Sequence, residues 1–114
     1  MYQPMNVELA CRLGMAAAIA AQCLWDGLDG QFEAETETAK GSLWIRMGHR
    51  QLSLLIPYLS PHMAKSALRR LVKGGILRTA DLNESPFDRT YWYAFAAYGK
   101  RLMAVACEDG QERP

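Results

Sequence analysis

The sequence predicts a single domain of the α+β class that is mostly helical. Its 114 residues suffice for one hydrophobic core, and 50% of them are hydrophobic. The segment Ser60–Lys73 has helical periodicity between clear start and stop signals. Two β-rich segments follow it, separated by the turn-forming cluster "NESPFD". Helices therefore dominate, and a β-hairpin is expected after the best-defined helix.

The N-terminal region, from Val7 to Leu28, has apolar residues close to helical spacing. Gly14 interrupts it, which predicts either a short helix that ends near Leu13 or a weak point within one helix. The second half is apolar on several faces, so we expect burial on more than one side, within the fold or against a second subunit. The apolar run is far shorter than the ~20 residues of a membrane span, and the residues before it are unlike a signal peptide. Together with three widely spaced cysteines, this predicts a cytoplasmic protein that does not enter the membrane.

The next elements are short. Residues 28–42 are polar, acidic and bounded by glycines, which predicts a mobile loop. Leu43–Met47 is β-rich and predicts a short strand. Gly48–Ile56 has the apolar spacing of a two-turn helix, which Pro57 ends.

The Ser60–Lys73 helix is the clearest element. Ser60 is a favoured N-cap, and Pro61 suits the first helical position. A glycine of the Gly74–Gly75 pair can adopt the left-handed conformation that ends a helix. Its apolar face consists of Ala64, Ala67, Leu68, Leu71 and Val72.

The C-terminal part predicts a hairpin and a helix. The strands Ile76–Leu82 and Arg89–Phe95 flank the turn Asn83–Asp88, a last helix spans Ala96–Cys107, and residues 108–114 are expected to fray. Two short helices followed by a hairpin are the order of a winged helix-turn-helix, here with an extra N-terminal helix and a C-terminal helix. The strand at 43–47 is expected to join the hairpin as a third strand.

Charge is unevenly distributed along the chain. The formal net charge is +1, but residues 41–101 contain ten Lys and Arg residues against three acidic residues, a net of +7. Residues 1–40 contain two basic residues against six acidic ones, a net of −4. Such asymmetry is typical of a chain with a localised nucleic-acid-binding surface.

Basic residues gather on one side of the Ser60–Lys73 helix, and the helix contains no acidic residue. Such a stripe on the second helix of a helix-turn-helix suits the major groove of duplex DNA. The alternatives are a solvated basic face and, for Arg89, an ion pair with Asp88. The three hairpin aromatics are expected to be core residues more than a base-stacking platform. Tyr91 and Tyr93 share one face, and Trp92 is the first candidate for an exception to core packing. The predicted DNA-binding residues are His62, Lys65, Ser66, Arg69, Arg70 and Lys73 on the helix, Arg89 in the wing, and Arg46 and Arg50, with His49, near the preceding helix.

The segments "LACRLGMAAAIAAQCLWDGL", "LWIRMGHRQLSLLIPYLSPHMAKSALRRLVKGGIL" and "LNESPFDRTYWYAF" carry a family resemblance. In order and spacing they resemble the N-terminal winged-helix domain of phage and plasmid replication proteins, the replisome-organiser type related to DnaD-like proteins. The resemblance covers most of residues 7–103. It implies binding of double-stranded DNA in replication or transcription control, through His62, Lys65, Ser66, Arg69 and Arg89.

The sequence contains no motif of a catalytic site. Its two histidines support no Ser-His-Asp or metal set, and "GKR" at 99–101 lacks the spacing of a phosphate loop. We therefore expect a non-catalytic protein without a metal or cofactor. The alternative function is a small phage-borne winged helix that binds a protein and inhibits host machinery, for example as an anti-CRISPR. A homodimer through the N-terminal or the last helix is a further expectation.

Overall fold

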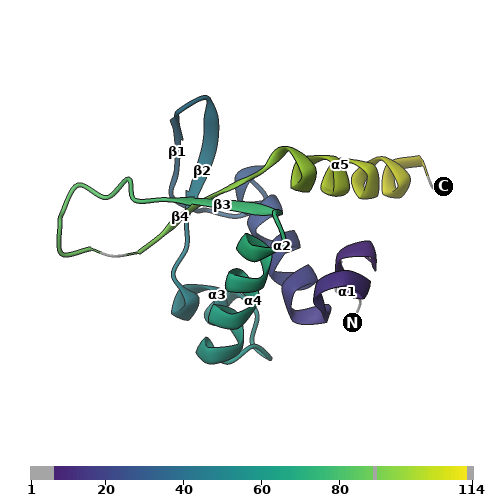
Figure 1. The fold of residues 1–114 in the computed structure, drawn as a ribbon, viewed down its shortest axis with the longest axis horizontal. Helices are drawn as coiled ribbons and strands as arrows, with labels where there is room; N and C mark the ends of the chain where they lie inside the picture. The colour runs from purple at the N-terminus through teal and green to yellow at the C-terminus, as the bar shows by residue number, and fades with distance from the viewer. Residues whose placement is uncertain (1–6, 89, 113–114) are drawn as a thin grey trace.

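The computed structural model describes residues 7–88 and 90–112, and side-chain burial within residues 9–88 and 90–104. In that part of the chain, five helices and a four-stranded antiparallel sheet form an α+β fold (Figure 1). The elements in chain order are α1 (Val7–Leu13), α2 (Met15–Leu28), β1 (Thr36–Ala39), β2 (Ser42–Arg46), α3 (His49–Leu55), α4 (Pro61–Lys73), β3 (Leu77–Ala80), β4 (Trp92–Phe95) and α5 (Ala97–Glu112).

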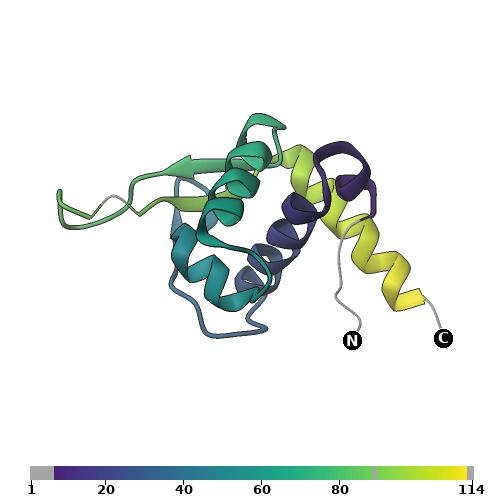
Figure 2. The same ribbon diagram turned by 90° about the horizontal axis from the view of Figure 1, so that it is seen from below.

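Helix α2 is the centre of the helical layer. It packs against α1, α4 and β2 of the same chain (Figure 2). Several of its small side chains are fully buried, which lets neighbouring elements approach closely. The apolar pattern on several faces of this segment is thus explained by burial within the fold. Gly14 separates α1 from α2, and this confirms the predicted short first helix. The buried residues of α2 are Ala17, Ala18, Ile19, Ala20, Ala21, Leu24 and Gly27.

The sheet has the strand order β1-β2-β4-β3 with all pairs antiparallel. The strand predicted at 43–47 does join the hairpin, because β2 pairs with β4 through Ile45↔Tyr93 and Arg46↔Trp92. Alternate residues face opposite sides. Ile45, Leu77, Tyr93 and Phe95 belong to the main core with the helices, whereas Trp44, Trp92 and Ala94 form a second cluster on the other face.

The acidic segment predicted as a loop contains a strand, so that part of the prediction was wrong. β1 pairs with β2 from Thr36↔Ile45 to Ala39↔Ser42. Both residues of the connecting turn have positive φ, 52° at Lys40 and 76° at Gly41, as tight hairpin turns require. Composition suggested disorder here, but pairing with the β-rich neighbouring strand satisfies the backbone while the acidic side chains stay exposed.

The C-terminal elements differ from prediction in their bounds. β3 and β4 are shorter than expected, so the connecting loop extends over residues 81–91 instead of 83–88. Helix α5 runs to Glu112, through residues predicted to fray. Within the described residues, none of the helices has the length and apolar character that a membrane span requires.

Candidate nucleic-acid interface

Helix α4 begins and ends as its sequence predicts. The Ser60 side chain accepts a hydrogen bond from the Met63 N–H at 3.2 Å, and Pro61 occupies the first turn. At the other end the N–H groups of Gly75 and Ile76 donate to the carbonyls of Val72 and Leu71, a Schellman motif. Gly75 takes the left-handed conformation, with φ of 77°. These signals fix which residues of α4 are buried, and hence which are exposed.

The predicted basic stripe of α4 is exposed. Ala64, Ala67, Leu68 and Leu71 are buried against the core, so the opposite side of the helix faces solvent. The exposed residues are His62, Lys65, Ser66, Arg69, Arg70 and Lys73.

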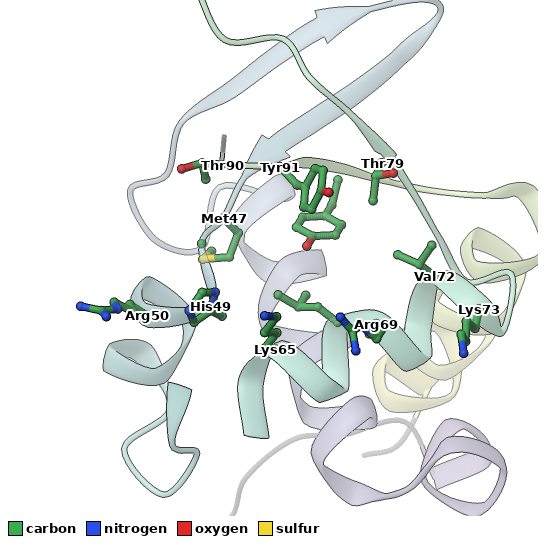
Figure 3. Close-up of a pocket in the computed structure, with 13 residues that line it drawn as sticks. Met47, His49, Arg50, Lys65, Arg69, Val72, Lys73, Thr79, Thr90 and Tyr91 are labelled. Atoms are coloured by element: carbon green, nitrogen blue, oxygen red, sulfur yellow. The ribbon is translucent and has the colours of Figure 1, made fainter. Parts of the chain in front are cut away.

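A hollow of about 890 Å³ lies between α4, the start of α3 and the β3–β4 hairpin, and we call it the α4 groove (Figure 3). Lys65, Arg69 and Lys73 line one wall along α4. Thr79 and Tyr91 line the opposite wall on the hairpin. The other lining residues are Met47, Gly48, His49, Arg50, Leu68, Val72, Thr90 and Tyr93.

A second hollow of about 540 Å³ lies between α3 and α4. His49, Arg50 and Lys65 line both hollows, and His62 lines the second. Neither hollow has an Asp or Glu among its lining residues. Within the described chain, no ion pair is found for Lys65 or Arg69. Unneutralised cations along a concave surface create a positive potential that attracts a polyanion.

The hairpin wall also provides neutral hydrogen-bonding groups. Tyr91 is 58% exposed, and its ring meets the Tyr93 ring edge-on with the centroids 6.3 Å apart. Burial, followed by the neighbouring Tyr91, raises the pKa of the Tyr93 hydroxyl to about 12. Tyr93 therefore stays protonated at neutral pH and adds no negative charge to the groove.

Two predicted contacts, Arg46 and Arg70, are engaged elsewhere in the fold. The Arg70 guanidinium donates to the Leu13 carbonyl at 3.2 Å, at the end of α1. Arg46 pairs with the carboxylates of Asp88 and Glu35. Neither arginine lines the α4 groove. Both therefore hold elements of the fold together in this structure.

Arg46 belongs to a polar cluster that we call the hairpin base: Arg46, Asn83, Asp88, Thr90 and Trp92. The Asn83 amide donates to the carbonyls of Asp88 at 3.0 Å and Thr90 at 2.7 Å, and its oxygen accepts from Trp92 Nε1 at 2.9 Å. The Asp88 carboxylate accepts from the Thr90 N–H at 3.0 Å and from Arg46. The Thr90 N–H first, and the Arg46 guanidinium next, hold the pKa of Asp88 below its ordinary value. The hairpin loop is thus anchored at its root by side chains.

The predicted roles of the hairpin aromatics need a correction. Trp92, the candidate exception to core packing, is only 6% exposed, because it packs with Trp44 on the far face of the sheet. Tyr91 is the exposed member of the three. Arg89 lies outside the described residues, so its predicted DNA contact and its alternative ion pair with Asp88 stay predictions. Among the described residues, Arg46 pairs with Asp88.

Two residues of the site were not among the predicted ones: Thr79, which lines the groove, and Asn83, which anchors the loop. The period-2 pattern of β3 and β4 places Thr79, Tyr91 and Tyr93 on one face, and this signal was available for Thr79. No local pattern identifies Asn83, whose partners are set by how the loop folds back on the strand.

Among the described residues, no three His, Cys, Asp or Glu side chains lie together as the ligands of a metal ion would. Comparison of the chain with protein-family models, curated proteins and solved structures finds no match.

Proposed function

We propose that this chain is a non-catalytic winged helix-turn-helix protein that binds double-stranded DNA. In this proposal α3 and α4 are the helix-turn-helix, α4 is the recognition helix, and the β3–β4 hairpin with loop 81–91 is the wing. The observation that carries it is the charge of the α4 groove and the hollow beside it. Cations from two helices line them, and no acidic residue does.

The geometry suits a duplex because α4 is an exposed ridge beside a hollow. His62, Ser66 and Arg69 stand on the exposed side of α4, where they can reach base edges in the major groove. Arg50, Lys65 and Lys73 flank the ridge, and one sugar–phosphate strand can lie along them. The groove thus supplies both kinds of contact that duplex recognition uses. A role in phage or plasmid replication, or in transcription control, is consistent with the resemblance of the sequence.

The test is fluorescence anisotropy of a labelled random duplex at several salt concentrations. We expect affinity to fall steeply with salt, because each neutralised phosphate releases counterions. Lys65→Ala, which removes a phosphate contact, should weaken binding and flatten the log–log salt slope by about 1. Arg69→Ala, which removes a base-edge contact, should weaken binding by about 1–3 kcal/mol.

Lys100→Ala and Arg101→Ala are the matched controls. They remove the same side chains from exposed positions on α5, outside the hollows. Both should leave the salt slope unchanged. Equal effects of all four substitutions would show that charge alone, and not the groove, drives binding. Absence of binding by the wild type at low salt would reject the DNA proposal, and the protein-binding alternative would then be tested by pull-down.

A further inference from the structure

The outermost turn of loop 81–91 presents an aromatic side chain to solvent. The Asp88 N–H donates to the Ser85 carbonyl at 3.2 Å and closes the four-residue turn Ser85–Asp88. Pro86 stands second in this turn, where its fixed φ favours the turned conformation. Phe87 follows, and its N–H donates to Ser85 Oγ at 3.2 Å. Phe87 is 92% exposed, more than any other large apolar side chain among the described residues.

The turn is carried on a fixed root. The hairpin base ties the two sides of the loop together through Asn83 and through the pair Arg46–Asp88. The position of the apex relative to the sheet is therefore constrained before any partner binds. Pre-organisation of this kind lowers the entropy cost of using an exposed side chain as a binding group.

The loop projects beyond the sheet in both views of the molecule (Figures 1 and 2). Thr90 and Tyr91, on the returning side of the loop, line the α4 groove. Phe87 belongs to the turn Ser85–Asp88, which comes just before Thr90 and Tyr91 in the chain. A duplex seated in the α4 groove would therefore continue past the apex that carries Phe87.

We propose that Phe87 is a wedge that inserts between two stacked base pairs from the minor groove and kinks the bound duplex. The proposal rests on the proposed function. The outer surface of a duplex is phosphate, sugar and polar base edges, so an aromatic ring gains most by contacting base faces. Phe and Pro are among the side chains that proteins insert at base steps, partially unstacking them and bending the DNA.

Two of the three acidic residues near Phe87 are engaged by other side chains or backbone groups, and the third would repel the phosphates of a bound duplex. Asp88 is neutralised by Arg46, and the Asp81 carboxylate accepts from the Asn83 N–H and side-chain amide. Glu84 is exposed and opposes the approach of phosphates. Removing its charge should therefore tighten duplex binding if the apex meets DNA.

The experiment uses the full chain and a short duplex with 2-aminopurine at TA steps, which unstack easily, and a fluorophore pair on its ends. Wild-type protein should raise the 2-aminopurine fluorescence and shorten the end-to-end distance. Phe87→Ala should abolish both signals and weaken binding about tenfold, as expected for the loss of one aromatic–base stack, while the salt slope stays unchanged. Phe87→Leu should retain part of both signals, because an aliphatic side chain also acts as a wedge.

The controls separate the wedge from the proposed function. Glu84→Gln should tighten binding, whereas Glu33→Gln, in the exposed loop before β1, should not. If Lys65→Ala weakens binding but Phe87→Ala leaves affinity and both signals unchanged, the wedge is rejected. If the wild type binds no duplex, the proposed function itself fails.

Discussion

The hairpin base and the α4 groove both contain arginines predicted to bind DNA, but they use them in opposite ways. At the hairpin base, Arg46 is bound to Asp88 and lies beside Asn83 and Thr90. In the α4 groove, Lys65 and Arg69 have no ion pair within the described chain. A paired cation stabilises the fold, whereas unpaired like charges around a hollow favour an anionic ligand. The comparison shows that the position of a basic residue in a motif does not reveal its role. The acidic and polar groups that the side chain contacts in the folded structure reveal that role.

The largest expected effect on stability is at the hairpin base. Asn83→Ala removes the two amide donors that hold the loop and leaves the buried Trp92 N–H without its acceptor. We expect the free energy of unfolding to fall by about 2–3 kcal/mol, since an unsatisfied buried donor alone costs about 1–3 kcal/mol. Urea denaturation followed by tryptophan fluorescence measures this. Glu84→Gln, an exposed neighbour, should change stability by less than about 0.5 kcal/mol.

An intermediate effect separates the two classes of arginine. Arg46→Met should lower the free energy of unfolding by about 1 kcal/mol, because its hydrogen bonds at the hairpin base are lost. Arg69→Met should leave stability within about 0.5 kcal/mol of the wild type, because its side chain is exposed in the groove. Chemical denaturation of both variants makes the comparison. If both variants lost the same free energy of unfolding, the assignment of Arg46 as structural and Arg69 as ligand-binding would be wrong.

The smallest expected effect is a dependence of stability on pH. The pKa of Asp88 is held below its ordinary value of 3.8 by the Thr90 N–H and by Arg46. A lowered folded-state pKa contributes stability that is present above the unfolded pKa and is lost as the pH falls through the folded pKa. Below about pH 4 the urea midpoint of the wild type should therefore decline more than that of Asp88→Asn. Parallel declines of the two midpoints would assign the acid sensitivity to other carboxylates.

Much of the candidate interface could be predicted because it depends on helical spacing. The 3.6-residue period of α4 places Lys65, Ser66 and Arg69 opposite Ala64 and Leu68, whatever the helix packs against. Arg46, Arg70 and Trp92 could not be assigned in this way. Their surroundings depend on residues distant in the chain, such as Leu13 for Arg70 and Trp44 for Trp92.

The sequence by itself determined where most elements lie and which side of α4 is charged. Ser60, Pro61 and Gly75 act on backbone groups within a few residues, so their signals are local. Only the tertiary structure decided that residues 36–39 are a strand, and that Arg46 is paired while Lys65 faces an open groove. These outcomes depend on contacts between residues far apart in the chain, and no local pattern encodes such contacts.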